Sequence, residues 1–507
     1  MLRYGTLGLQ SSWMLEAGQP LARRVEKGMQ RLVEPSCLFR QMTESESVDV
    51  PLHRDTRVLD LARKLRLFPA TNIVIANMIG AGIFTTSGLL MQQLGSPLLM
   101  IALWVGGGVL ALCGALCYGE LGAAMPRAGG EYRYLSELFH PLLGFLTGWV
   151  SFFVGFSAPL AASALGFSEY LSRAMPGVTV WGDPDLIKKG IAISIILALT
   201  LVHMRGLELG AKVQNYLTVG KVVLIAVVVI FGFWLGRGSF GHFQQGTGAQ
   251  GGVAGWKTAG LSLMWIMFAY SGWNASAYIG SEIRNPNRNL PFSLLLGTGL
   301  VLLLYLSLNV LFVYAMPPRD MNGVIAIGGL AASRLFGGPA DTAISMLIAF
   351  ALLSSISALI ILGPRVYYAM AKDGYFFRFV SDVHPVFRVP SKAIVLQFFI
   401  ASVMVMSGTF DQILTYMGFC LGIFPIAAVL GVFKLRKTNN GTHRMPLFPI
   451  PPLLFSVVSA AILVLAYLER PVESSIALLT VGLGLPVYFV FAKARRERPL
   501  AVTEDSE

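Results

Sequence analysis

The sequence predicts an all-α integral membrane protein with twelve transmembrane helices. Of its 507 residues, 55% are hydrophobic and only 13% are charged, whereas soluble domains carry about 25% charged residues. Twelve apolar segments approach or exceed the length of about 20 residues that a helix needs to cross a bilayer. They lie near residues 70–91, 97–121, 134–172, 188–204, 213–236, 257–281, 291–316, 340–371, 392–408, 411–433, 450–468 and 472–492.

The distribution of basic residues predicts that both chain ends are cytoplasmic. Lys and Arg collect in the cytoplasmic loops of membrane proteins. With the N-terminus inside, the cytoplasmic loops, the C-terminal tail and the span ends beside them hold 19 of these residues, Arg365 among them. The opposite loops and their span ends hold 8. We therefore assign residues 1–66 and 493–507 to cytoplasmic tails. The net charge of +12 reflects this asymmetry, and no basic run with interleaved aromatic residues suggests nucleic-acid binding.

The cysteines and histidines predict no metal site and no cofactor. Cys113 and Cys117 are one helical turn apart, but neither Cys37, Cys420 nor any of the six histidines completes a ligand set beside them. A membrane enzyme would need a polar catalytic set at membrane depth, and the sequence contains none. We therefore do not expect an enzyme.

The stretch NMIGAGIF, residues 77–84, places Gly80 and Gly82 in the middle of the first apolar segment. In lipid, a broken helix occurs only where it lines a cavity or is buried in protein. The glycines could instead allow close packing of a neighbouring helix, or the helix could be unbroken. Ser271 and Gly272 interrupt the sixth segment in the same way, and such a matched pair is typical of transporters built from inverted repeats.

This pattern predicts a five-plus-five arrangement. The repeats would span residues 67–236 and 257–434, joined by an extracellular connection at 237–256, with two further helices at 435–492. A broken helix exposes N–H groups at one end and carbonyl groups at the other. The apolar cores of spans one and six contain no charged side chain. Such backbone ends suit a zwitterion, and an α-amino acid is the simplest one.

Four motifs occur in order along the chain: NMIGAGIF, YGELGAAMPRAGGEYRYLSE, MFAYSGWNASAYIGSEIRNPNRNLP and RVYYAMAKDG. Together they resemble the amino acid–polyamine–organocation (APC) superfamily, and most closely its L-type amino acid transporter (LAT) branch, from about residue 66 to 495. The resemblance implies the LeuT-like inverted repeat, a substrate site between unwound spans one and six, and alternating access.

The resemblance also implies which residues bind the substrate. The carboxylate would meet the N–H groups of Ala81, Gly82 and Ile83. The α-ammonium would meet carbonyl groups near Met78, Phe268, Ala269 and Ser271. The Phe268 ring would serve as a gate that covers the substrate from outside; plain packing in the core or against lipid is the alternative.

Lys221 lies inside the fifth apolar segment, where an unpaired ammonium costs roughly 3 kcal/mol or more. It could snorkel to the cytoplasmic surface. The resemblance implies instead that it occupies the place of a sodium ion and bridges span one to span eight, with Ser354, Ser355 and Ser357 as candidate partners. It would then be a fixed cation in an exchanger or a proton carrier in a symporter, and the sequence leaves both open.

Two acidic residues, Glu120 and Glu282, end spans two and six on the predicted cytoplasmic side. With Arg127 and Arg284 close by in the sequence, they could form a cytoplasmic gate. The alternative is that they are solvated charges at helix ends.

The sequence therefore predicts a sodium-independent transporter that exchanges neutral L-amino acids across the plasma membrane. Proton-coupled symport and a non-transporting amino acid sensor are the alternatives. Neutral substrates are expected because no charged residue is predicted at the side-chain end of the site. Eukaryotic LAT light chains carry a tethering cysteine between spans three and four; the corresponding loop here, residues 172–190, has none. We therefore expect no disulfide-linked heavy subunit.

Overall fold

The protein is helical throughout the part of the chain that the structure describes. This computed structural model describes residues 61, 63–180, 182–246, 252–324, 327–407, 410–438 and 443–496. The chain divides into two units, Met1–Val58 and Leu59–Glu507, and the first lies outside these residues. Within them, β pairing is limited to two isolated bridges, Leu65–Ile283 and Ala128–Ile279. The predicted helical class is confirmed.

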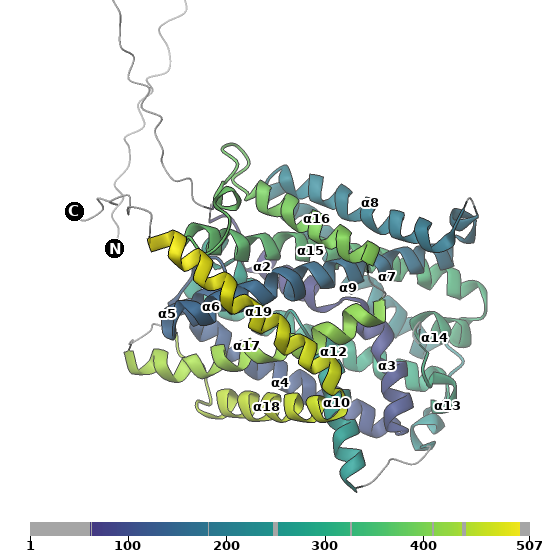
Figure 1. Cartoon of the computed structure of the whole chain (residues 1–507). Helices are drawn as coiled ribbons and strands as arrows, with labels where there is room; N and C mark the ends of the chain where they lie inside the picture. The colour runs from purple at the N-terminus through teal and green to yellow at the C-terminus, as the bar shows by residue number, and fades with distance from the viewer. Residues whose placement is uncertain are drawn as a thin grey trace, which may run out of the picture. The chain divides into compact units, whose positions relative to one another are not determined.

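The elements are shown in Figure 1. Up to residue 246 they are α2 (Leu67–Met78), α3 (Ala81–Leu94), α4 (Pro97–Ala124), α5 (Glu131–Leu138), α6 (Pro141–Val150), η1 (Ser151–Ser157), α7 (Ala158–Ala174), η2 (Pro176–Thr179), α8 (Pro184–Met204), α9 (Leu207–Leu235) and η3 (Phe240–Gln244). After it they are α10 (Gly252–Ala269), α11 (Ala275–Tyr278), η4 (Gly280–Glu282), α12 (Pro286–Ala315), α13 (Pro318–Met321), α14 (Ile327–Phe336), α15 (Pro339–Lys372), η5 (Arg378–Ser381), α16 (Ser391–Ser407), α17 (Phe410–Thr438), α18 (Ile450–Glu469) and α19 (Pro471–Arg496).

Proline and side-chain caps explain several helix starts. Helix α4 begins at Pro97, directly after Ser96, whose hydroxyl accepts the N–H of Leu99. Helix α8 likewise begins at Pro184, after a capping aspartate. Proline is favoured at the first helical position because its missing N–H would have no partner there.

Nine helical stretches in the described residues are long and apolar enough to cross a membrane. They correspond to nine of the twelve predicted segments. The other three predictions, 257–281, 392–408 and 411–433, fall on α10 with α11, on α16 and on α17. The chain is thus a helical, multi-pass membrane protein, whereas the count of twelve and the repeat arrangement stay predictions.

Two spans form the interior of the bundle. In the most apolar stretch of Leu67–Leu94, 83% of the residues are buried, and in that of Pro339–Lys372, 72% are buried. The corresponding shares for Leu207–Leu235 and Ser474–Arg495 are only 22% and 17%. Helix α12 packs against both α2 and α4, α15 packs against α7, and α8 lies beside α16 (Figure 1). The peripheral helices therefore carry the lipid-facing surface.

The two longest predicted segments differ in structure. The segment at 134–172 divides into α5, α6, the π-helical η1 and α7, and π-helical turns often occur at functional sites. Helix α15 is continuous over 34 residues. At 1.5 Å per residue it is about 51 Å long, so it extends past a hydrocarbon core of about 30 Å.

Candidate functional site

The first span is broken at its glycines. Helix α2 ends at Met78, and α3 begins at Ala81. Ile79 and Gly80 lie between them in non-helical conformations, with φ/ψ of −76°/82° and −110°/−155°. The N–H of Gly80 donates to the carbonyl of Met78 at 2.8 Å. The glycine pattern predicted a broken helix in the first span, and the structure has this break inside the bundle.

The sixth span is also broken. Helix α10 ends at Ala269, and the short α11 begins at Ala275. Between them the N–H of Ser271 donates to the carbonyl of Phe268 at 2.9 Å, and Gly272 adopts φ +100°. Residues with a Cβ atom rarely adopt that φ. The break therefore requires glycine at position 272.

The two breaks touch each other. A Cβ atom on Gly82 would lie 2.9 Å from the Cα of Ala269 and 3.5 Å from the ring of Phe268. A Cβ atom on Gly272 would lie 2.9 Å from the backbone carbonyl carbon of Asn77. Both glycines thus permit close approach of the two interrupted helices.

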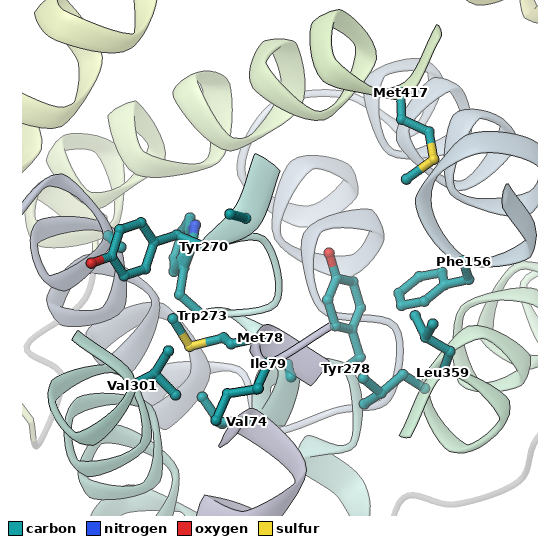
Figure 2. Close-up of a cluster of buried hydrophobic side chains, with 14 of the residues drawn as sticks. Val74, Met78, Ile79, Phe156, Tyr270, Trp273, Tyr278, Val301, Leu359 and Met417 are labelled. Atoms are coloured by element: carbon teal, nitrogen blue, oxygen red, sulfur yellow. The ribbon is translucent and has the colours of Figure 1, made fainter. Parts of the chain in front are cut away.

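A cavity of about 150 Å³ lies at the two breaks. A cavity of that size accommodates a molecule such as benzene. Its lining includes six of the seven residues predicted to contact substrate: Met78, Ala81, Gly82, Phe268, Ala269 and Ser271. Ile83 is absent from the lining, and its side chain is fully buried; the predicted contact through its N–H group stays a prediction. Figure 2 shows Met78, Tyr270 and Trp273 as members of a cluster of buried hydrophobic side chains.

The amino end of α3 is suited to bind an anion. Its N-cap, Gly80, has no side chain to cap the helix. The first N–H groups of a helix have no partner within the helix and carry partial positive charge. Ala81 and Gly82 hold these groups at the cavity. This end can therefore bind a carboxylate without a basic side chain.

The carboxyl end of α2 is bound by Lys221. The ammonium of this fully buried residue donates to the carbonyls of Ile79 at 2.6 Å and Ala76 at 3.2 Å, and to the hydroxyl of Ser355 at 3.1 Å. A cation at the negative end of a helix is favourable. The side chain thus joins α2 to α15 and does not snorkel to the surface.

The other two serines predicted to contact Lys221 have different partners. Ser354 receives hydrogen bonds from Gln214 and shares one with Thr218. Ser357 pairs with the buried His203 at 2.7 Å. Both serines connect α15 to neighbouring helices, away from the ammonium.

Among the polar residues of the cavity lining, Glu131, Tyr278 and Asn77 were not predicted as site residues from the sequence. Glu131 is buried at the start of α5, and its Oε1 accepts from Asn274 at 2.6 Å and from the Tyr278 hydroxyl at 3.0 Å. The acidic residue after the Gly129–Gly130 pair was the available signal; that no charged residue lies at the side-chain end of the substrate stays a prediction. Figure 2 places Tyr278 beside Phe156 of η1.

Asn77 is the third of these polar residues. Its Oδ1 is buried without a hydrogen-bond partner among the described residues. A buried acceptor of this kind is available to a donor on a ligand. No sequence pattern marked it.

Phe268 lies partly exposed at the cavity, next to Gly82. This position is compatible with covering a ligand. Its role as a gate stays a prediction.

The acidic residues at the ends of spans two and six do not pair with the expected arginines. Glu120 accepts two hydrogen bonds from Arg436, each at 2.6 Å, and Glu282 forms a buried bidentate pair with Arg365 at 2.7 and 3.2 Å. Arg127 and Arg284, which lie close to them in the sequence, are therefore not their partners, and the cytoplasmic gate stays a prediction. Both glutamates are buried, so they are not solvated helix-end charges either.

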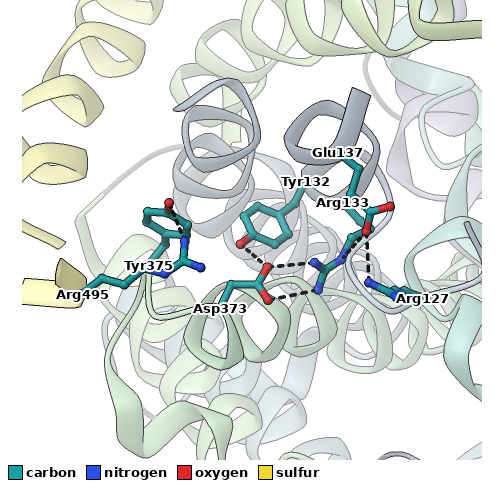
Figure 3. A network of polar contacts seen from close by, with 7 residues as sticks. All are labelled: Arg127, Tyr132, Arg133, Glu137, Asp373, Tyr375 and Arg495. Carbon is teal, nitrogen blue, oxygen red and sulfur yellow. Dashed lines mark hydrogen bonds and ion pairs between the residues drawn. The ribbon is translucent and has the colours of Figure 1, made fainter. Parts of the chain in front are cut away.

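A second polar network joins the second and fourth motifs (Figure 3). Asp373 accepts the Tyr132 hydroxyl at 2.7 Å and pairs with Arg133 at 3.0 Å. Glu137 pairs with both Arg127 and Arg133. This network fixes the start of α5 to the end of α15.

Comparison with known proteins identifies the family. A model described as amino acid permease matches residues 65–486. The b(0,+)-type amino acid transporter 1 of Mus musculus is 28% identical over 465 residues, which is 90% of this chain and 93% of the relative. The serine/threonine exchanger SteT of Bacillus subtilis (strain 168) is 30% identical over 444 residues, or 86% and 98%.

A further relative is the large neutral amino acids transporter small subunit 2 of Oryctolagus cuniculus, 28% identical over 444 residues, or 85% and 80% of the two chains. The matched region contains both broken helices, the cavity and Lys221. The chain therefore belongs to the amino acid permease family, as a LAT-like member of the APC superfamily.

Proposed function

We propose that this permease exchanges neutral L-amino acids across the plasma membrane by alternating access and without sodium. The observation that carries the proposal is the cavity at which both broken helices end. It combines free N–H groups at the start of α3 with carbonyl groups at the ends of α2 and α10. An amino acid carries the complementary carboxylate and ammonium.

The proposed topology has twelve spans and cytoplasmic termini. Helices α2 and α3 form span one, and α10 and α11 form span six. Interruptions at matching positions support two inverted repeats, at 67–236 and 257–434, with 237–256 between them and two final spans in 435–492. Residues 1–66 and 493–507 are the proposed cytoplasmic tails.

Lys221 supports sodium independence. Its ammonium already supplies a positive charge to the Ala76 and Ile79 carbonyls. A bound sodium ion would satisfy the same oxygen ligands and would be repelled by the ammonium. We propose that Lys221 and Ser355 couple the cavity to α15, and that Ser354 and Ser357 take part in this coupling through α9 and α8.

Neutral substrates fit the balance of the lining. Glu131 is the acidic side chain of the cavity, but its Oε1 already accepts from Asn274 and Tyr278. Phe268 and Phe156 provide apolar surface.

We also propose that no disulfide-linked subunit is needed, because the free cysteines in the described residues, Cys113, Cys117 and Cys420, are buried.

The test is uptake of radiolabelled L-alanine into proteoliposomes. Vesicles are loaded with L-alanine or left empty, sodium is replaced by choline, and a pH gradient is imposed in separate arms. We expect uptake that needs internal L-alanine and ignores sodium. Protein-free vesicles are the control.

Other outcomes distinguish the alternatives. Uptake that ignores internal L-alanine but follows the pH gradient would establish proton symport. Binding without flux would establish a sensor. Competition by each of the twenty amino acids then defines the range of substrates.

A further inference from the structure

One buried acidic residue at the cavity has no basic partner. The described part of the chain buries three acidic side chains, those of Glu120, Glu131 and Glu282. Glu120 pairs with Arg436, and Glu282 pairs with Arg365. None of the ion pairs among the described residues includes Glu131, which is only 5% exposed and lines the cavity. Glu131 therefore differs from the other buried acids in its environment.

The hydrogen bonds of Glu131 come from neutral groups. Its Oε1 accepts from the Asn274 amide at 2.6 Å and from the Tyr278 hydroxyl at 3.0 Å, and the amide also donates to that hydroxyl at 3.1 Å. The hydroxyls of Tyr118 and Tyr134 lie near the carboxyl group and have no hydrogen-bond partner among the described residues. A hydroxyl oxygen can accept a hydrogen bond. These surroundings suit a neutral carboxyl group, which accepts at one oxygen and donates from the other.

An ionised carboxylate would be costly at this position. A buried charge without a partner of opposite sign is disfavoured, and such a group takes up a proton instead. Burial accordingly raises the pKa of Glu131 above its usual value. The titratable groups near it are Tyr118 of α4, Tyr134 of α5 and Tyr278, and tyrosine is neutral near pH 7. The side chains that α6, η1, α15 and α17 contribute to the cavity carry no charged group.

The loop before α5 closes one side of the cavity against α11. The N–H of Gly129 donates to the Tyr278 carbonyl at 3.1 Å. Gly130 adopts φ +50°, and a Cβ atom there would lie 2.6 Å from the Tyr278 ring. The proposed topology places this contact on the cytoplasmic side of the breaks. Opening of the cavity to the cytoplasm would therefore separate Glu131 from its donors on α11 and admit water.

We propose that Glu131 is a proton-binding site whose occupancy is linked to closure of the cavity towards the cytoplasm. The protonated residue favours the closed arrangement, and water that enters on opening stabilises the ionised form. Because the proton is taken from the cytoplasm and returned to it, it regulates exchange without being transported. The link to transport rests on the proposed function, whereas proton binding by the closed arrangement does not.

The direction of the pH effect follows from the raised pKa. The closed state binds the proton more tightly than the open state, so closure is fully favoured below the ordinary glutamate pKa of about 4.3. This preference is lost as the pH rises through the raised pKa of the closed state. We therefore expect exchange to be slow in acid and faster at higher pH.

Infrared difference spectroscopy of the purified protein, in a detergent without ester groups, tests proton binding directly. We expect the wild type to show the C=O band of a protonated carboxyl group, which fades as the pH rises from about 5 to about 8. Glu131→Gln is expected to lack this band. Glu137→Gln is the matched control and is expected to retain it, because Glu137 lies on the same helix but pairs with Arg127 and Arg133.

A second variant keeps this test valid if Glu131→Gln is not recovered as folded protein. Glu131→Asp retains a carboxyl group and is expected to shift the frequency of the band, which assigns the band to this position. Absence of a titrating band from the wild type, or the same band in every variant, would overturn the proposal.

Exchange of L-alanine in proteoliposomes, with equal pH on both sides, tests the link to closure. We expect the wild-type rate to rise about tenfold between about pH 5 and pH 8. Glu131→Gln is expected to be slow and independent of pH, and Glu137→Gln to follow the wild type. The same pH profile in Glu131→Gln and the wild type would show that the link is wrong. A wild-type protein that neither binds nor transports any amino acid would refute the proposed function and leave the infrared result intact.

Discussion

The breaks in spans one and six have different physical origins. In span one, side chains from other helices bind the exposed carbonyls: Lys221 and Ser355 at Ile79, and Tyr305 at Met78. Gly80 itself adopts φ −110°, which any residue can adopt. In span six, Tyr305 also binds the exposed Ala269 carbonyl, but the break depends in addition on the local backbone, because Gly272 adopts φ +100° against the backbone of Asn77.

The difference shows which residues each break depends on. The first break is stabilised by tertiary partners, so it is sensitive to changes on α9, α12 and α15. The second also has tertiary partners, but it depends in addition on the conformational freedom of one glycine, Gly272. Where the two breaks cross, the lack of a side chain on Gly82 is the shared requirement.

The largest effect is expected from Gly82→Val. The new side chain would press on the Ala269 backbone and crowd the proposed carboxylate site. We expect binding of L-alanine to be abolished, measured by calorimetry on the purified protein. Binding at the wild-type level would place the site elsewhere.

The next largest effect is expected from Lys221→Ala. It removes the ammonium that binds the end of α2 while Ser355 remains in place. We expect transport to be lost or uncoupled in proteoliposomes, with most of the protein still folded by size-exclusion chromatography. Unchanged transport would show that the lysine has no coupling role.

Gly272→Ala tests the local origin of the second break. A residue with a side chain in that conformation costs on the order of 1–3 kcal/mol, and its Cβ would also press on Asn77. We expect Gly272→Ala to have both a lower Tm and weaker L-alanine binding than the wild type. A Tm equal to that of the wild type would mean that span six does not depend on this glycine.

Gly80→Ala is expected to have the smallest effect and is the matched control for Gly82. A Cβ atom at position 80 would meet only Ser355 Oγ, at the ordinary contact distance of 3.9 Å. We expect a stability change within about 0.5 kcal/mol and near-normal binding. Loss of binding equal to that of Gly82→Val would remove the distinction between the two positions.

The sequence predicted the breaks because glycine in a membrane helix is a local signal. Lys221 was predictable for a related reason, since a charge inside an apolar segment needs a partner. Residues such as Tyr305 and Glu131 were not predictable, because their roles depend on contacts between distant parts of the chain. The same reason explains why Arg436 and Arg365 could not be predicted as the partners of Glu120 and Glu282.

Arg365 illustrates a further limit of the sequence patterns. Its position near the end of a span led us to count it among the basic residues of a cytoplasmic loop. The structure buries it within α15, paired with Glu282. Helix α15 extends well past the apolar core, so a charge near its end remains inside the protein.

The most direct test of the central claim is an electron cryomicroscopy structure of the permease in lipid nanodiscs with L-alanine. We predict density between the two breaks, with the carboxylate at the N–H groups of Ala81–Ile83 and the ammonium at the Met78 and Ala269 carbonyls. Density for L-alanine at another position, or held only by charged side chains, would contradict it.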